Sequence, residues 1–239
     1  MCVRYTLHKS DAAIAVIARS LGRKLAPPGW AAPKYNLTLT NTVPVVAIVS
    51  DLGPAVYGMR WGMSTAFGDG PPRLWPNAMA EKAVKSPAWR SATAKRRCLV
   101  PANGFYEWET AGGVKYPHLF TLRDEEPFAF AGIWSKSSDP DEPESFAILT
   151  TEPNSVVGRY HDRMPVLLPA ELMPRWIGTE PLSPEEFQSL TRPLDPARMA
   201  EREVSRYVSK SGHDGPRCQA GPEPRQTPEA PSPQLDLGL

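Results

Sequence analysis

The chain has 239 residues, of which 41% are hydrophobic and 22% charged, and its formal net charge is +1. This length is enough to bury one substantial core, so we expect a single folded domain. The near-neutral charge excludes a histone-like polycation, so any binding of nucleic acid must depend on a local patch.

Cysteine usage and hydropathy limit the compartment. The three cysteines, Cys2, Cys98 and Cys218, are odd in number and include no C-x-x-C pair, which argues against a disulfide framework and a structural zinc site. The N-terminus has no apolar signal core, and the longest apolar stretches, near residues 43–49 and 128–134, are far shorter than a membrane span. We therefore expect a cytoplasmic monomer with no metal, no cofactor and no membrane contact.

The predicted elements begin with a helix and continue mainly as strands. Ser10 or Asp11 can cap a helix that runs to about Leu21, with Ile14 and Ile17 on one face. Runs rich in β-branched and aromatic residues predict strands at 43–49, 56–61, 98–101, 118–122, 128–134, 146–151 and 164–168. Short amphipathic helices are expected at 170–177 and 184–190. The predicted fold class is α+β, a mainly antiparallel or mixed β-sheet with short flanking helices.

The composition changes near the C-terminus. Six prolines lie between Pro216 and Pro233 in a stretch otherwise rich in Gln, Glu and Gly. Such a segment cannot bury enough apolar area to order itself. We therefore expect a folded domain at residues 1–214 and a disordered Pro-rich tail at 215–239.

Cys2, directly after Met1, is the most informative residue, because a small second residue allows the initiator methionine to be removed. Removal would expose an amine beside a thiol, and an α-amino group with a pKa near ~7.7–8.0 is substantially neutral at cellular pH. The amine can attack an aldehyde to form a Schiff base, which the thiol can close to a thiazolidine. On position alone a cysteine here is more often without a role, so other groups must support it.

Two further segments supply such groups. The segment RRCLVPANGFYEW, residues 96–108, places Glu107 between two aromatic residues, an environment that raises a carboxyl pKa and suits an acid/base. The segment YHDRMP, residues 160–165, flanks His161 with charged partners for proton transfer, and Arg163 can hold a phosphate. The histidines without such partners are interpreted as surface or packing residues: His8, His118 and His213.

These blocks resemble those of the SOS response-associated peptidase (SRAP) family. They are MCVRY at the start, YNL at 35–37, RWG at 60–62, NA at 77–78, residues 96–108, TTE at 150–152 and residues 161–168, in family order over roughly residues 1–212. The resemblance implies a nucleoid-associated protein of the DNA damage response. It implies binding of single-stranded DNA with abasic sites, a covalent thiazolidine cross-link, removal of the protein's own leader and an abasic-site lyase activity.

The resemblance also assigns roles by motif. Cys2 is the nucleophile, Asn77 orients the N-terminus and the sugar, Glu107 shuttles protons and His161 promotes Schiff-base chemistry. The resemblance assigns phosphate binding or base stacking to the remaining site residues: Arg4, Arg163, Trp61, Phe67 and Trp108.

Three departures from the family pattern affect the expected DNA contacts. Val3 stands where the family usually has glycine, which narrows the approach to Cys2. Met79 replaces an arginine that contacts the backbone, a loss for which Lys82 or Lys85 could compensate. Residues 63–67 also lack the usual proline and tryptophan.

Two alternatives stay open at this point. An N-terminal-nucleophile amidohydrolase would use Cys2 to attack an amide, with Asn103 and Gly104 forming an oxyanion hole. A non-catalytic binding module would use Arg4, Arg96, Arg97 and Arg163 as a phosphate patch.

The last six residues suggest a partner. They resemble the short peptide by which bacterial polymerases dock on the replicative sliding clamp. Gln234 would fill a polar subsite, and apolar contacts would come from Leu235, Leu237 and Leu239.

Overall fold

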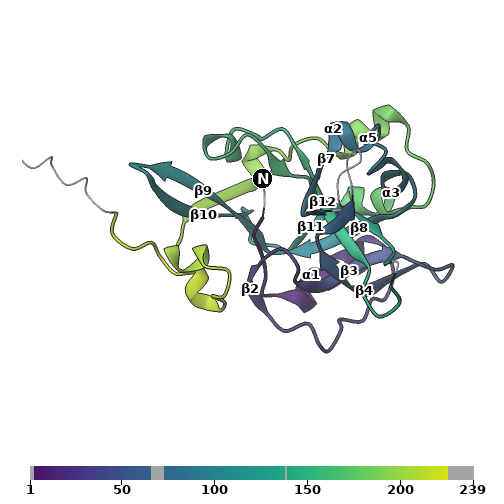
Figure 1. Ribbon diagram of the computed structural model, residues 1–239, viewed down its shortest axis with the longest axis horizontal. Coiled ribbons are helices and arrows are strands. Elements are labelled where there is room, and N and C mark those ends of the chain that lie inside the picture. The colour runs from purple at the N-terminus through teal and green to yellow at the C-terminus, as the bar shows by residue number, and fades with distance from the viewer. Residues whose placement is uncertain (1–2, 66–72, 138, 226–239) are drawn as a thin grey trace, which may run out of the picture.

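The computed structural model describes residues 3–65, 73–137 and 139–225 (Figure 1). Cys2, Phe67 and the expected clamp peptide at residues 234–239 lie outside these ranges. Within them, no helix is long and apolar enough to cross a membrane.

The first of two large sheets, sheet A, contains the N-terminal strand. Its order is β15-β10-β9-β1-β2, and all its pairings are antiparallel. The strands are β1 (Tyr5–Leu7), β2 (Lys34–Leu37), β9 (Gly104–Ala111), β10 (Val114–Leu122) and β15 (Met199–Glu203). The N-terminal strand therefore lies inside the sheet, between two neighbours distant in sequence.

The second sheet, sheet B, has the order β13-β12-β4-β3-β8-β11-β14, with β7 added beside β12. Its strands are β3 (Thr42–Ile48), β4 (Pro54–Trp61), β7 (Asn77–Met79), β8 (Arg97–Ala102), β11 (Phe128–Ser135), β12 (Ser145–Thr151), β13 (Met164–Pro165) and β14 (Leu167–Leu168). β12 is parallel to β4 and β7, and β11 also pairs with β12, which closes a ring of strands. A small hairpin of β5 (Met63–Thr65) and β6 (Arg73–Trp75) stands apart.

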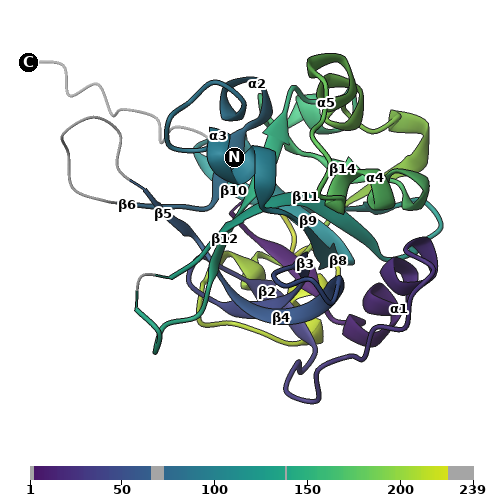
Figure 2. The ribbon, with the colours of Figure 1, turned by 90° about the vertical axis from the view of Figure 1, so that its right-hand side faces the viewer.

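Short helices cover one face of sheet B (Figure 2). They are α1 (Ser10–Ser20), α2 (Ala80–Ala83), α3 (Arg90–Lys95), α4 (Met173–Ile177) and α5 (Pro184–Leu190). The 3₁₀ turns are η1 (Val157–Arg159), η2 (Ala170–Leu172), η3 (Pro196–Arg198), η4 (Arg206–Ser209) and η5 (Pro216–Gln219), and the last two lie beside sheet A. The mixed α+β class is confirmed. The expected side-chain cap of the first helix is wrong: Lys9 occupies the N-cap position without a capping side chain, and its N–H donates to Asn103 Oδ1 at 2.8 Å.

Three buried clusters hold the layers together. The first joins sheet A to sheet B and includes Tyr5, Phe105 and Phe120 from what we call the inner face of sheet A. The second lies between sheet B and the helices. The third packs Tyr106 and Leu119, on the outer face of sheet A, against the C-terminal segment.

The C-terminal segment, residues 205–225, extends the packed chain beyond the expected boundary at residue 214. Cys218 in η5 is fully buried, and Arg225 Nη2 lies 2.6 Å from carboxylate oxygens of both Glu109 and Glu203. Residues 215–225, which composition alone assigned to the tail, thus contact the folded domain through the buried Cys218 and the ion pairs of Arg225. In Figure 1 this yellow segment lies beside the hairpin of β9 and β10.

Candidate functional site

Glu107 lies on β9, only 4% exposed. The glycine that precedes it in GFYEW allows the two central strands to approach closely. A Cβ added at Gly104 would lie 2.7 Å from the carbonyl oxygen of Phe120, a contact that real Cβ atoms do not tolerate. The motif therefore combines a steric requirement with a buried carboxyl group.

The N-terminal strand runs alongside this carboxyl group. Tyr5 pairs with Phe105 and Thr6 with Gly104, and the backbone N–H of Tyr106 donates to the Arg4 carbonyl oxygen at 3.0 Å. In this antiparallel register, the chain from Tyr5 back to Val3 runs alongside β9 from Phe105 to Glu107. The first described residues therefore lie toward the buried carboxyl group.

The environment of Glu107 changes its acidity. Burial disfavours the charged form and raises the pKa of Glu107 to about 7, and the nearby negative charge of Asp162 acts in the same direction. A carboxyl group with a pKa near neutrality can both donate and accept a proton at cellular pH. The sequence-based expectation of a raised pKa agrees with this environment.

His161 lies on the loop after η1. Its Nδ1 lies 3.0 Å from the backbone N–H of Arg163 and 2.7 Å from Asp162 Oδ1, and these contacts require different tautomers. Burial lowers the pKa of His161, and the Asp162 side chain is 87% exposed. We infer the neutral ring, in which Nδ1 accepts from the fixed backbone N–H of Arg163 and the proton is on Nε2.

Asn77 begins β7 and is 5% exposed. It pairs in parallel with Ile148 of β12, and the same strand pairs with β13, which follows the His161 loop. On the other side of the site, the Tyr160 ring lies 4.3 Å from the ring of His118, the cross-strand partner of Glu107. β12 and the Tyr160 contact thus connect the three expected site residues Asn77, Glu107 and His161.

The Arg163 guanidinium binds other groups of the protein. It makes a bidentate contact with Glu81, at 2.5 and 2.9 Å, and donates to the Thr150 carbonyl oxygen at 2.7 Å. A phosphate at this position would have to replace Glu81.

Arg4 and Trp108 lie on the outer face of sheet A, opposite Glu107, because successive residues of a strand point to opposite faces. Arg4 donates to Asn36 Oδ1 at 3.0 Å and to the carbonyl oxygens of Val208 at 2.7 Å and Ser209 at 2.9 Å. Trp108 Nε1 donates to Ser209 Oγ at 3.0 Å. The structure therefore does not bring these two side chains together with Glu107.

Trp61 corrects one expectation. Its side chain is fully buried, packs edge-on to Tyr5 with ring centroids 5.1 Å apart, and donates to the Pro76 carbonyl oxygen at 2.9 Å. A fully buried ring cannot stack on a base, so Trp61 is a core residue and not a DNA contact.

Residues required by the two alternatives also have structural roles. Arg97 is 4% exposed and donates to backbone carbonyl oxygens around the ends of α3 and α4, including Ala94 at 2.8 Å and Trp176 at 2.6 Å. It cannot join a phosphate patch. Asn103 Oδ1 accepts the Lys9 N–H, which ties this side chain to the start of α1.

His118 was missed by the sequence reasoning, which treated it as a surface or packing residue. It is 4% exposed and lies between two carboxylates, Glu201 and Glu109. The acidic partners come from β9 and β15, so the relevant signal was strand pairing, which sequence alone did not provide.

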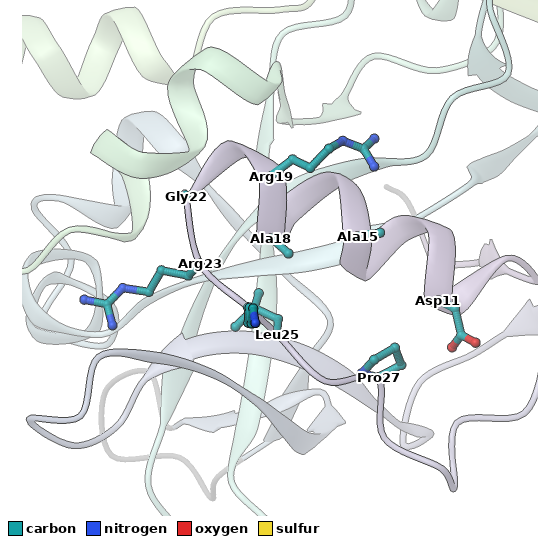
Figure 3. Close-up of a pocket in the computed structure, with 9 residues that line it drawn as sticks. Asp11, Ala15, Ala18, Arg19, Gly22, Arg23, Leu25 and Pro27 are labelled. Atoms are coloured by element: carbon teal, nitrogen blue, oxygen red, sulfur yellow. The ribbon is translucent and has the colours of Figure 1, made fainter.

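Two surface hollows lie away from this centre. One, of about 670 Å³, is formed by α1 and the turn after it, with Arg19, Arg23 and Leu25 in its lining (Figure 3). The other, of about 1060 Å³, runs between α2, α3 and α5 and is bordered by Glu81 and Thr151. Among the described residues, Asn77, Glu107 and His161 line neither hollow.

Comparison with known proteins gives a consistent result. The model of the family described as SOS response associated peptidase (SRAP) matches residues 1–211. The chain is 30% identical over 222 residues to abasic site processing protein YoqW of Bacillus subtilis, covering 90% of this chain and 97% of that protein. It is 32% identical over 215 residues to YoaM of the same bacterium, covering 87% and 93%. A crystal structure of a Bacteroides thetaiotaomicron protein matches with a TM-score of 0.75 at 27% identity, covering 92% of this chain and 100% of the other.

Proposed function

The chain belongs to the SOS response associated peptidase (SRAP) family, and from this we propose that it processes abasic sites in single-stranded DNA. Its relatives YoqW and YoaM are named for abasic site processing and align over nearly their whole lengths. The observation that carries the proposal is the β1–β9 register, which aims the N-terminal strand at a buried carboxyl group with a pKa of about 7.

The proposed chemistry starts with removal of Met1. The amine of Cys2 attacks the aldehyde carbon of the ring-opened sugar and, with loss of one water molecule, forms an imine. The thiol sulfur then adds to the imine carbon while its proton passes to the nitrogen. The product is a thiazolidine that joins the protein to the DNA strand.

Three side chains assist these reaction steps. Glu107 relays protons during the loss of water and the ring closure, because both its protonation states are populated near neutral pH. Neutral His161 donates from Nε2 to the leaving oxygen, and Asn77 orients the amine and the sugar. Self-removal of a leading residue would use Glu107, and strand cleavage from the imine would use His161.

DNA binding in this proposal follows the single strand. A ring-opened sugar must leave the base stack to reach the site, which favours an unpaired strand. Arg163 exchanges Glu81 for a phosphate, and Phe67 offers its ring to a flanking base. Arg4 and Trp108, on the outer face of sheet A, are assigned no DNA contact in this proposal.

The decisive experiment is mass spectrometry of the protein mixed with single-stranded DNA that carries one abasic site, with an intact strand as control. We expect a covalent adduct on the N-terminal peptide. Cys2→Ala should form no stable adduct, while Cys2→Ser should form only a labile imine that borohydride can trap. Undiminished cross-linking by Cys2→Ala would refute the chemistry, and glutamine hydrolysis without DNA would point to the amidohydrolase alternative.

We also propose that residues 234–239 bind a bacterial sliding clamp. Residues 226–233, between the packed segment and this peptide, would then tether the domain near unpaired template and raise its local concentration there. A peptide of residues 233–239 should bind the clamp, and one with Gln234, Leu235 and Leu237 changed to alanine should not. Equal binding of both peptides, or of neither at high micromolar concentration, would contradict this proposal.

A further inference from the structure

A cluster of ionisable groups lies on the inner face of sheet A, directly beside Glu107. His118 is the cross-strand partner of Glu107, and directly opposed residues project from the same face of a sheet. The His118 ring meets a carboxylate at each nitrogen: Nδ1 lies 2.5 Å from Glu201 Oε1, and Nε2 lies 3.4 Å from Glu109 Oε2. Its side chain is only 6% exposed, so these contacts are largely shielded from water.

The carboxylates are themselves held in place. Arg225 contacts Glu109 and Glu203 at 2.6 Å each, and Arg159 Nη2 lies 3.5 Å from Glu201 Oε2. The side chains of Glu201 and Glu203 are 15% and 18% exposed, whereas that of Glu109 is 34% exposed, so the Glu201 side of the cluster is the more enclosed. These groups, with Glu107 and Tyr160, are the charged and titratable side chains that surround His118 in the described chain.

The cluster reaches the loop that carries His161. The centroid of the Tyr160 ring lies 4.3 Å from that of the His118 ring, and burial and the nearby negative charge of Glu201 raise the pKa of Tyr160. Arg159 and Tyr160 immediately precede His161 in the chain. The loop therefore contacts sheet A through the two residues before its histidine.

We propose that His118 is a positioning residue: held between Glu201 and Glu109, it fixes the Tyr160 loop against β9 and so sets the separation of His161 from Glu107. This inference rests on the proposed function for its catalytic consequence. The geometric consequence is independent of any reaction.

The need for such a residue follows from the construction of the site. Glu107 belongs to sheet A, whereas the His161 loop leads into β13 of sheet B. A misplacement of about 1 Å between reacting groups can cost on the order of a hundredfold in rate. Two catalytic groups on different sheets keep their distance only if a contact crosses between the sheets, and the His118–Tyr160 contact does so.

The test compares His118→Leu with Arg175→Gln. The control breaks a 2.8 Å ion pair with Glu186 between α4 and α5, away from the cluster. The first readout is an NMR titration of the histidine rings without DNA, with the His161 signal assigned by its loss in His161→Gln. Burial lowers the pKa of His161, so a loosened loop in His118→Leu should shift its midpoint upward. The His161 midpoint should stay unchanged in Arg175→Gln.

The second readout is single-turnover cross-linking to abasic single-stranded DNA. We expect the rate of His118→Leu to fall by about 10- to 100-fold, with affinity for intact single-stranded DNA within about twofold of the parent. A purely structural role would lower the melting temperature and leave both the His161 midpoint and the rate unchanged, which would overturn the proposal.

Two further arms complete the design. If His118→Leu does not fold, Tyr160→Leu replaces it, because that change removes the ring that contacts His118. The same upward shift of the His161 midpoint is expected, and no shift would refute the role. If the parent protein does not react with abasic DNA, the proposed function fails. The titration then still decides whether His118 positions the loop.

Discussion

The two faces of sheet A differ in how they use their polar groups. On the inner face, Glu107 and His118 are buried among ionisable neighbours, and His118 contacts the His161 loop through Tyr160. On the outer face, backbone and side-chain oxygens of β2 and the C-terminal segment already accept from Arg4, and Tyr106 donates to the Tyr35 carbonyl oxygen at 2.8 Å. Residues of β9 that point inward therefore belong to the proposed catalytic site, and those that point outward stabilise the fold. Substitutions at neighbouring positions of β9 should accordingly affect either the cross-linking rate or the stability.

The largest effect should come from Glu107→Gln on the inner face. Loss of the proton carrier should slow cross-linking by about 10²- to 10⁴-fold, because general acid–base catalysis contributes on that order. Affinity for intact single-stranded DNA should remain unchanged, since no phosphate contact is lost. Single-turnover kinetics and fluorescence anisotropy measure the two quantities; equal losses in both would contradict the division between the faces.

The same substitution should alter the pH dependence of stability. The pKa of Glu107 in the folded state, about 7, is above its unfolded value, so the folded state binds more protons and wild-type stability falls as pH rises from about 4.5 to 7. The glutamine variant lacks this loss. Its free energy of unfolding relative to wild type should increase by about 3 kcal/mol between pH 4.5 and pH 8, measured by urea denaturation.

Glu109→Gln is the matched control for that experiment. The hydrogen bond from Arg225 is the main reason that the pKa of Glu109 is lowered. Its stabilising contribution is therefore present above the unfolded pKa and lost as pH falls, so removing it should change stability in the opposite sense. If the stability difference from wild type changed with pH in the same direction for both variants, the raised pKa of Glu107 would be contradicted.

Truncation tests the outer face. A chain that ends at Asp214 loses the buried Cys218 and the Gln219 hydrogen bond to Thr6, 3.1 Å long. It should be less stable than the full chain by about 2 kcal/mol. A chain that ends at Arg225 keeps these contacts and should match the full chain in thermal unfolding. Equal stability of the two truncations would show that residues 215–225 add nothing.

Arg4→Lys should have a smaller effect. Lysine cannot reproduce the planar fork that reaches Asn36, Val208 and Ser209 together. We expect a loss of roughly 1.5 kcal/mol in the free energy of unfolding and little change in the cross-linking rate at saturating DNA. A rate loss without a stability loss would place Arg4 in the chemistry instead.

The smallest effect is expected at Met79, which lies on neither face, at the end of β7. Met79→Arg supplies the charge that the family resemblance implies at this position. It should tighten binding to single-stranded DNA and steepen the salt dependence by about 0.7 per phosphate contacted. No change in either quantity would show that residue 79 lies away from the DNA backbone.

Sequence reasoning succeeded where a local pattern was sufficient. The segments at 43–49 and 128–134 are strands within one residue of the expected bounds, and the helix at 184–190 matches α5 because Ser183 and Glu186 form a capping box. The strand β15 was missed because its sequence, MAERE, is charged; its acidic residues become half-buried only in the sheet, where β15 pairs with β10.

The sequence motifs indicated the candidate catalytic residues but not the side chains that surround them. GFYEW and HDRMP indicated Glu107 and His161, whereas the exclusion of Trp61 from the surface and the position of His118 depend on which strands pair. Pairing between β10 and β15 joins residues 77 to 85 positions apart, from Leu122–Met199 to His118–Glu203, and no local periodicity encodes it.

The place of β1 in sheet A also has a consequence for protein synthesis. β1 and its partner β9 are separated by almost a hundred residues, which a ribosome adds in about 5 to 20 s at roughly 5–20 residues per second. During that delay the first strand has no β9 with which to pair. Enzymes that trim nascent chains thus have a window of seconds in which the segment is accessible, and the window closes when the GFYEW strand emerges.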